Sequence, residues 1–318
     1  MLSIGVLGIN FKTADLALRE AIARGAQTLN GERAIFFSHP IVVLSTCNRT
    51  EIYFSDDDLP GVHSDLLAYL RKQIEVPFEH RLYSYFGTDC FTHLCRVTAG
   101  LDSAIFAETE IQRQVKLAYG KARVLPSCLH FAFQKALKVG KTVRTQLELE
   151  RGSPTLYSKL WQMTNWKNKR ILIVGHSEIN RGLISFLQHK DVQNISICTR
   201  YLDAVKLEGI HLSDRNALNE WQQFDVIVCA SRSEKYLIKG QGSMRHWIFD
   251  LSVPRNVDPE VGKSTNLYNI DELIERNEPL HKIEACEALV RSNVTKLARI
   301  YRVKTQHGLE NVEMQSHL

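Results

Sequence analysis

Four short apolar runs in the second half of the chain constrain its fold most strongly. Each has four or five residues, and helical stretches separate one run from the next. The runs are Ile171–Val174, Ile195–Cys198, Val226–Ala230 and Trp247–Leu251. Buried strands that alternate with helices at this spacing are typical of a parallel, doubly wound sheet. We therefore predict a Rossmann-like domain over residues 151–279, with Gly152 and Pro154 marking its start.

The first half of the chain has a different order of elements, with strands first and helices after them. The predicted strands are Ser3–Gly8, Ile41–Ser45 and Glu51–Phe54. The predicted helices are Val62–Ile74, Asp89–Thr98, Ser103–Arg123 and His130–Thr145. This order is typical of an α+β domain, which we assign to residues 1–150.

Residues 280–318 form a third predicted segment. Apolar side chains recur there at helical spacing among charged ones, and they predict one long amphipathic helix from about Leu280 to Val303. The apolar positions are Ile283, Cys286, Val290, Leu297 and Tyr301. The polar tail from Lys304 is expected to fray.

Composition narrows the class of protein. The chain has 318 residues, 44% of them hydrophobic, which is enough for two domains with separate cores. A net charge of +5 permits an anionic partner such as RNA without requiring one. The seven cysteines show no short-range disulfide framework, residues 1–10 resemble a strand more than a signal peptide, and no apolar run reaches membrane-spanning length. We therefore predict a reduced, cytoplasmic protein with no membrane segment.

A cysteine, Cys47, follows the second predicted strand, with Thr46, Asn48 and Arg49 around it. A nearby cation favours the thiolate form of a cysteine, so this environment suits a reactive nucleophile. A buried structural cysteine is nevertheless the commoner fate of a lone cysteine. The residues alone leave both interpretations open.

Several segments, in the same order along the chain, resemble the glutamyl-tRNA reductase family. Ser45–Tyr53, which reads STCNRTEIY, resembles the active-site segment of that family. The other segments that agree are Gly8–Ala14, His93–Val97, Gly100–Ser103, Gly140–Thr145 and Val253–Pro259. The similarity covers roughly residues 1–303 and is more specific than any single motif.

The resemblance implies NADPH-dependent reduction of glutamyl-tRNA(Glu) to glutamate 1-semialdehyde, the first committed step of tetrapyrrole biosynthesis. Cys47 is implied to attack the ester carbonyl and form a thioester. His93 is implied to act beside it as a proton carrier or orienting group, although the residues alone favour a satisfied helix histidine. Arg49 is implied to bind the side-chain carboxylate of the substrate. The other implied substrate-binding residues are Thr46, Asn48, Ser103, Glu108, Thr109, Glu110 and Gln114.

Two features of the implied substrate-binding residues need comment: one is a difference from the family's motif, and the other is their spacing along a predicted helix. The family's Gly-Glu-Pro-Gln is altered to Ala107-Glu108-Thr109-Glu110, so an acid replaces an amide at Glu110. Glu108 is retained, and the resemblance implies that it is a partner for the α-amino group of the substrate. Glu108 and Gln114 are six residues apart, a spacing that does not place them on one face of a straight helix. Either the helix begins after Glu108 or the pocket wraps around it.

The predicted cofactor site is the turn after Ile171–Val174. Its residues are Gly175, His176, Ser177, Glu178, Ile179 and Asn180. Only Gly175 matches the glycine fingerprint of dinucleotide-binding domains, so the turn alone fits an ordinary strand–turn–helix equally well. Ser177 can still offer a hydroxyl and an N–H group to a phosphate at a helix N-terminus. Thr199 and Arg200 follow the next strand, and a cation there suits the 2′-phosphate of NADP or is a solvated surface charge.

The expected partners follow from the resemblance and from charge. Lys135, Lys138, Lys141 and Arg144 form a basic stripe that either meets tRNA phosphates or is a solvated face. The downstream glutamate-1-semialdehyde aminomutase is a candidate partner. The family dimerises through a C-terminal helical domain, which we expect to be absent or a stub here, so the homodimer is not carried over. No histidine or cysteine spacing predicts a metal site.

Two other functions remain as alternatives. In the first, the altered cofactor turn no longer serves NADPH, and the enzyme hydrolyses glutamyl-tRNA through the same thioester. In the second, the chain is a tRNA-binding relative without catalytic activity.

Overall fold

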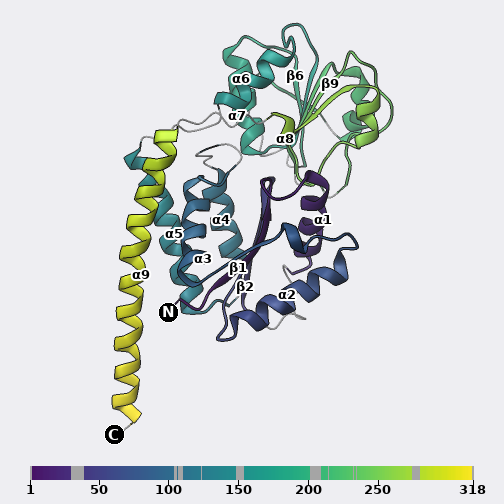
Figure 1. Ribbon diagram of the computed structural model, residues 1–318. Helices are drawn as coiled ribbons and strands as arrows, with labels where there is room; N and C mark the ends of the chain where they lie inside the picture. Colours follow the sequence, from purple (N-terminus) through teal and green to yellow (C-terminus); the bar gives the residue numbers. More distant parts are fainter. Residues whose placement is uncertain are drawn as a thin grey trace. The chain divides into compact units, whose positions relative to one another are not determined.

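The computed structural model describes residues 2–29, 39–103, 106, 110–122, 124–147, 154–200, 209–213, 215–231, 233, 235–273 and 280–316 (Figure 1). The chain divides into two compact units. The first unit contains residues 1–151 together with 276–318, and the second contains residues 152–275. The first unit combines an antiparallel sheet with helices and the second a parallel sheet with helices, as the predicted α+β and doubly wound α/β classes require.

An antiparallel sheet lies at the centre of the first unit. Its strands are β1 (Gly5–Asn10), β2 (Ile41–Ser45), β3 (Arg49–Phe54) and β4 (Tyr83–Phe86), in the order β2-β3-β1-β4. Strands β2 and β3 form a hairpin whose last paired residues are Ser45 and Thr50. This register places residues 46–49 at the turn of the hairpin.

Helices cover both faces of this sheet, because the apolar residues of each strand alternate between two cores. Leu7 and Ile52 pack with α1 (Leu16–Gln27) and α2 (Leu59–Gln73). Val6 and Tyr53 face the other core, with α3, α4, α5 and α9. These helices are Gly87–Ala99, Glu110–Lys121, Ser127–Gln146 and Leu280–Ser316, and a short 3-10 helix spans Glu79–Arg81.

The long helix α9 belongs to the first unit and packs along α3 and α5 (Figure 1). Cys286, Val290 and Val294 are its buried residues within that core. Tyr301 contacts Phe131 of α5, with ring centroids 4.8 Å apart. The predicted amphipathic helix is confirmed in this region.

The second unit is a six-stranded parallel sheet in the order β10-β9-β8-β5-β6-β7. The strands are β5 (Ile171–Val174), β6 (Ile195–Cys198), β7 (His211–Ser213), β8 (Val226–Cys229), β9 (Trp247–Asp250) and β10 (Asn266–Asn269). The helices are α6 (Pro154–Met163), α7 (Glu178–His189) and α8 (Ile270–Leu273), with 3-10 turns at Arg215–Leu218, Trp221–Gln223 and Pro259–Lys263. The predicted doubly wound sheet is confirmed, and its four apolar runs form its central strands.

Several boundaries differ from the sequence prediction, three of them for a clear physical reason. Helix α4 begins at Glu110 instead of Ser103, because residues 101–103 form the turn after the left-handed glycine that ends α3. Strand β3 begins at Arg49, two residues early, because it pairs with β1 as far as Asn10. Helix α9 continues to Ser316 beyond the expected fraying point, since no proline follows Lys304. Within the described residues, no helix combines the length and the apolar character needed to cross a membrane.

Candidate functional site

The turn between β2 and β3 presents Cys47. The backbone N–H of Thr46 donates to the carbonyl of Arg49 over 2.8 Å and closes the turn. The Thr46 hydroxyl accepts from the N–H groups of Asn48 and Arg49, at 3.1 and 3.2 Å. Thr46 therefore holds the shape of the turn. Cys47 is partly exposed at this turn, whereas the other six cysteines are buried.

A cation from another element reaches the same turn. Arg19 of α1 is only 2% exposed, and its Nη1 donates to the backbone carbonyl of Cys47 over 2.7 Å. The sequence interpretation placed Arg49 beside the thiol and did not include Arg19. A charged residue on the buried face of an amphipathic helix was the available signal, because such a residue needs a buried partner.

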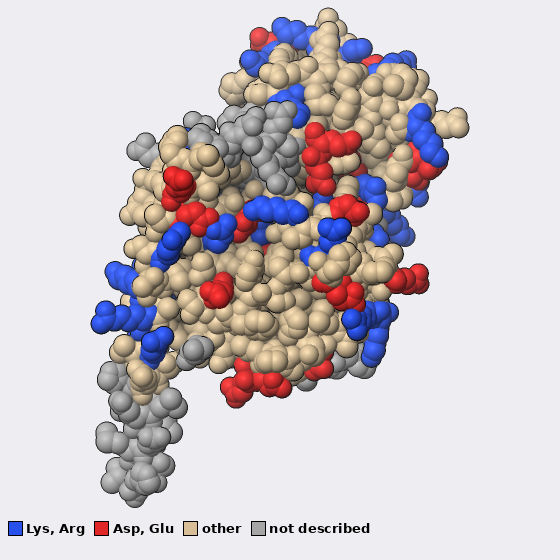
Figure 2. All heavy atoms as spheres, in the orientation of Figure 1, with Lys and Arg blue, Asp and Glu red and all other residues tan. Residues whose placement is uncertain are grey.

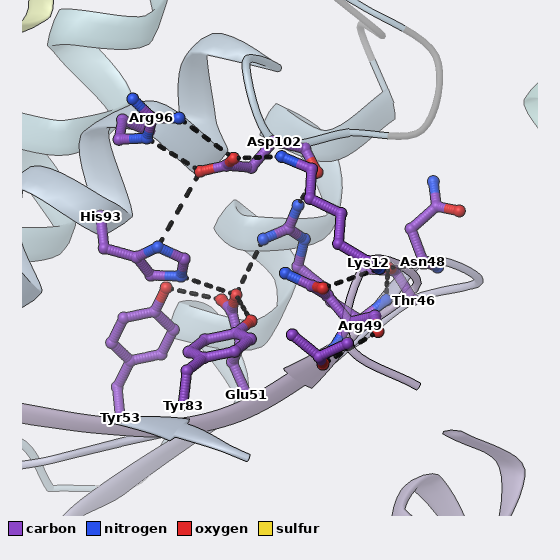
Figure 3. Close-up of polar contacts among 12 residues, drawn as sticks. Lys12, Thr46, Asn48, Arg49, Glu51, Tyr53, Tyr83, His93, Arg96 and Asp102 are labelled. Atoms are coloured by element: carbon purple, nitrogen blue, oxygen red, sulfur yellow. Dashed lines mark hydrogen bonds and ion pairs between the residues drawn. The ribbon is translucent and has the colours of Figure 1, made fainter. Parts of the chain in front are cut away.

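The guanidinium of Arg49 is completely buried behind this turn (Figure 3). Its Nη1 lies 2.8 Å from Glu51 Oε1, and its Nη2 donates to the carbonyl of Asp102. Burial opposes the charge of Arg49, but the carboxylates of Glu51 and Asp102 hold its pKa above the ordinary value. Arg49 thus remains a cation inside the protein.

Glu51 gathers three further polar side chains, all of which point at its carboxylate in Figure 3. The hydroxyls of Tyr53 and Tyr83 each donate to it over 2.6 Å, and His93 Nε2 lies 2.8 Å from Oε1. Burial would raise the pKa of Glu51, but the charge of Arg49 and the contacts with His93 and Tyr53 lower it well below the ordinary value. The structure therefore connects the predicted residue His93 with Arg49 through Glu51, a role for Glu51 that the sequence interpretation missed.

Two buried polar atoms beside Cys47 lack a hydrogen-bond partner in the structure. They are Oδ1 of Asn48, an acceptor, and Nε of Arg49, a donor. Buried polar atoms without partners are uncommon, and each calls for an explanation such as a ligand. One acceptor and one donor are therefore left without a partner on successive residues of the Cys47 turn.

The remaining predicted substrate residues lie on or near α4. Ser103 is buried immediately after Asp102, and Gln114 is half-buried on α4. Glu110 is buried at the start of α4 and forms an ion pair with Arg113, at 2.9 Å between its Oε2 and the Arg113 Nε. Glu108 and Thr109 lie outside the described residues.

The predicted cofactor residues meet at the carboxyl edge of the second sheet. Gly175 follows β5 with a positive φ of 94°, and its N–H donates to the Cys198 carbonyl over 2.8 Å. A Cβ on Gly175 would lie 2.6 Å from the Ala230 carbonyl, so only glycine fits there. Strand β5 lies between β6 and β8, where the chain leaves the sheet in opposite directions. Such a switch point is where doubly wound sheets bind their ligands.

The rest of the turn is built around the start of α7. Ser177 caps the helix by accepting from the Asn180 N–H, and His176, Glu178 and Ile179 are half-buried beside it. Asn180 replaces the third glycine of the fingerprint, and its amide donates to the Val174 and Gly175 carbonyls over 2.9 and 2.8 Å. This amide keeps helix and strand together where glycine usually does. The turn therefore fits a dinucleotide despite its missing glycines.

Thr199 and Arg200 follow β6 at the same edge of the sheet. Thr199 is half-buried and Arg200 is exposed. The register pairs Val174 with Cys198, so the two strands that carry Gly175 and Arg200 end side by side. All predicted cofactor residues consequently lie around one edge.

The first unit presents a cysteine on a turn. The second unit is a doubly wound sheet whose carboxyl edge resembles a dinucleotide-binding site. Together these features define the class of thiol-bearing oxidoreductases. The family model for the N-terminal domain of glutamyl-tRNA reductase matches residues 7–147, and that for shikimate / quinate 5-dehydrogenase matches residues 158–276. The chain belongs to the glutamyl-tRNA reductase family.

Individual relatives agree with this assignment. Glutamyl-tRNA reductase of Akkermansia muciniphila is 30% identical over 91% of this chain and 96% of its own length. That of Chlamydia caviae is 36% identical over 79% of this chain and 78% of its own length. The solved glutamyl-tRNA reductase of Methanopyrus kandleri matches 99% of this chain and 87% of that chain, with a TM-score of 0.51 at 21% identity. This last likeness concerns the fold.

Proposed function

We propose that the chain reduces glutamyl-tRNA(Glu) to glutamate 1-semialdehyde with NADPH, through a thioester on Cys47, and so supplies tetrapyrrole biosynthesis. The observation that carries the proposal is the Cys47 turn, with a partly exposed thiol beside two buried polar atoms without partners. Membership of the glutamyl-tRNA reductase family, with relatives that match most of the chain, supports the substrate.

The chemistry begins with the thiolate of Cys47, which attacks the ester carbonyl that joins glutamate to the tRNA. The C–S bond forms, the C–O bond breaks, and the tRNA 3′-oxygen leaves and takes up a proton. The resulting thioester is reduced more easily than the ester, which is the advantage of covalent catalysis here. Bound NADPH would supply the hydride for this reduction, and the Cys47 thiolate would leave as the aldehyde forms. Two electrons thus pass to the substrate, and Cys47 is regenerated.

The two unpartnered atoms match the free ends of esterified glutamate. The side-chain carboxylate is an acceptor that the Arg49 Nε–H would bind, in addition to the contacts that Arg49 already makes. The α-ammonium is a donor that Asn48 Oδ1 would accept. Glu51 would keep Arg49 charged and oriented for this task, and His93 would remain the candidate proton carrier.

The carboxyl edge of the second unit would hold NADPH. The Gly175 turn would admit the pyrophosphate next to the N-terminus of α7, with Ser177 as the helix cap. Arg200 would meet the 2′-phosphate, since the two residues directly after β6 are Thr199 and Arg200 and neither is an acid.

Exposed cations provide a surface for the tRNA backbone. Figure 2 shows Lys and Arg side chains gathered along the part of α9 next to its grey end. The exposed cations of this stretch are Arg291, Lys296, Arg299, Arg302 and Lys304, with no acid among them. On α5, Lys138 and Lys141 are exposed while Lys135 and Arg144 are half-buried. Such cations would meet phosphates and make binding depend on salt concentration.

The test is a single turnover with glutamyl-tRNA carrying labelled glutamate, with and without NADPH. We expect label on Cys47 without NADPH and labelled semialdehyde with it. If the label is released only as free glutamate in both reactions, the enzyme is a hydrolase and not a reductase. No label on the protein and no product would leave only tRNA binding.

A further inference from the structure

The carboxylate of Asp102 forms ion pairs with two cations, Lys12 and Arg96 (Figure 3). Its Oδ1 accepts from Lys12 Nζ over 2.8 Å. Arg96 grips both oxygens, with Nε to Oδ2 at 3.0 Å and Nη2 to Oδ1 at 3.2 Å. A bidentate pair of this kind fixes the orientation of a carboxylate as well as its position. The side chain of Asp102 is only 10% exposed, so solvent screens these contacts weakly.

The backbone of Asp102 faces the pocket residue Arg49, whose Nη2 donates to the Asp102 carbonyl. The next residue is Ser103, another predicted substrate contact. The local chain explains this arrangement, because Gly100 ends α3 with a φ of 80° and the Leu101 N–H returns to the Arg96 carbonyl over 3.0 Å. The turn folds Asp102 back over the last turn of α3, where its side chain meets Arg96.

The long helix α9, although distant in the sequence, contributes a second anion that contacts Arg96. Arg96 Nη1 donates to Oε1 of Glu287, which follows the buried residue Cys286. Two cations, Lys12 and Arg96, then balance two anions, Asp102 and Glu287. The packing of α9 on α3 is therefore connected to the Asp102 carbonyl, and through it to Arg49.

We propose that Asp102 is a positioning residue that fixes Arg49 for recognition of the glutamate side-chain carboxylate, and that α9 takes part in this recognition through Glu287. The inference rests on the proposed function, because it assigns Arg49 the substrate carboxylate. Helix α9 then serves substrate selection in addition to packing.

The preference for charged glutamate over uncharged glutamine distinguishes a positioning role of Asp102 from a merely structural one. An Arg49 that is held in place favours glutamate over glutamine on the same tRNA, since only glutamate brings a carboxylate to the guanidinium. A displaced Arg49 loses this preference. General loosening of the fold instead slows the transfer of both amino acids alike.

The experiment compares the rates at which full-length protein takes up label on Cys47 from one tRNA carrying either glutamate or glutamine. The ratio of the two rates is the readout. We expect Asp102→Asn to lower the ratio about tenfold, the size of a lost charge-assisted contact. Glu287→Gln should lower it about two- to threefold, because Arg96 and Glu287 are 29% and 25% exposed. Glu284→Gln, one turn earlier on α9 and exposed, is the matched control and should leave the ratio unchanged.

Lys12→Gln is the second variant, because Lys12 is 40% exposed and we expect the protein to fold without it. If Asp102→Asn does not fold, the inference is tested with Lys12→Gln and Glu287→Gln. A wild-type ratio of glutamate to glutamine uptake in both variants then overturns it. A folded Asp102→Asn that keeps the wild-type ratio also overturns it. Failure of the Cys47 thioester, the part of the proposed function on which the inference rests, is distinguishable, because the wild-type protein itself would then take up no label.

Discussion

Arg19 Nη1 donates to the backbone carbonyl of Cys47 over 2.7 Å, from a helix that lies before the cysteine strand in the sequence. Arg49, the neighbour of the cysteine in sequence, is instead paired with Glu51 at 2.8 Å. The charge of Arg49 is thus compensated by a buried anion. Arg19 is the cation whose hydrogen bond reaches the cysteine residue itself.

Arg19→Met should slow the alkylation of Cys47. A nearby cation favours the thiolate, so its removal should slow the reaction at neutral pH and move the alkylation profile toward higher pH. Arg19→Lys should fall between, because it keeps the charge without the planar fork. The measurement is the rate of iodoacetamide modification of Cys47 between pH 6 and 10, followed by mass spectrometry. Arg24→Met, an exposed change on the same helix, is the control. An identical profile in folded Arg19→Met would remove Arg19 from this role.

Cys47→Ser should abolish both label transfer and semialdehyde formation while tRNA affinity stays nearly unchanged. A serine hydroxyl is a far weaker nucleophile than a thiolate, whereas the change removes no charge that contacts phosphate. Product formation and filter binding measure the two properties. Cys128→Ser is a matched control, because the Cys128 thiol already lies 2.9 Å from the Ser55 hydroxyl. Retained reduction by Cys47→Ser would exclude the thioester.

Glu51→Gln should lower the free energy of unfolding by about 3–5 kcal/mol, because it leaves the buried Arg49 without its anion. Tyr53→Phe removes a single hydrogen bond to Glu51 and should cost about 1 kcal/mol. Urea unfolding at neutral pH measures both. A loss in Glu51→Gln no larger than that in Tyr53→Phe would show that the ion pair is unimportant for stability.

The same carboxylate predicts a pH dependence. The folded pKa of Glu51 is lowered from the ordinary value of 4.5, so the unfolded chain takes up the proton first as pH falls. Glu51 therefore contributes its full stability above about pH 4.5 and loses it in acid. Unfolding free energies measured from pH 7 to pH 3 should fall steeply in the wild-type protein and less steeply in Glu51→Gln. Parallel curves would contradict the prediction.

The elements with strong local patterns were predictable from the sequence. The apolar runs Ile171–Val174 and Ile195–Cys198 became strands with the same bounds, because buried parallel strands need continuous apolar residues. Strand β4 (Tyr83–Phe86) was missed, since a short half-exposed strand is specified by its pairing with β1 and carries little pattern of its own.

Within the candidate site, too, only the residues that are close together in the sequence were predictable. The reactive turn around Cys47 is contiguous in sequence, so its residue types were visible together. Arg19 and Asp102 reach it across 28 and 53 residues of chain, through hydrogen bonds to Cys47 and from Arg49. No local periodicity specifies such contacts. Their one sequence signal is that charged residues on buried positions need partners.

Arg200→Ala should raise the KM for NADPH about tenfold while the KM for NADH changes little. The guanidinium is the cation after β6 at the switch edge, and only NADPH carries a 2′-phosphate for it to bind. Steady-state reduction of glutamyl-tRNA with each coenzyme gives the ratio. Arg170→Ala is the matched control, since Arg170 is exposed and precedes β5 at the amino edge of the same sheet. An equal loss with both coenzymes would assign Arg200 to general stability of the edge, and no loss with either would place the 2′-phosphate elsewhere.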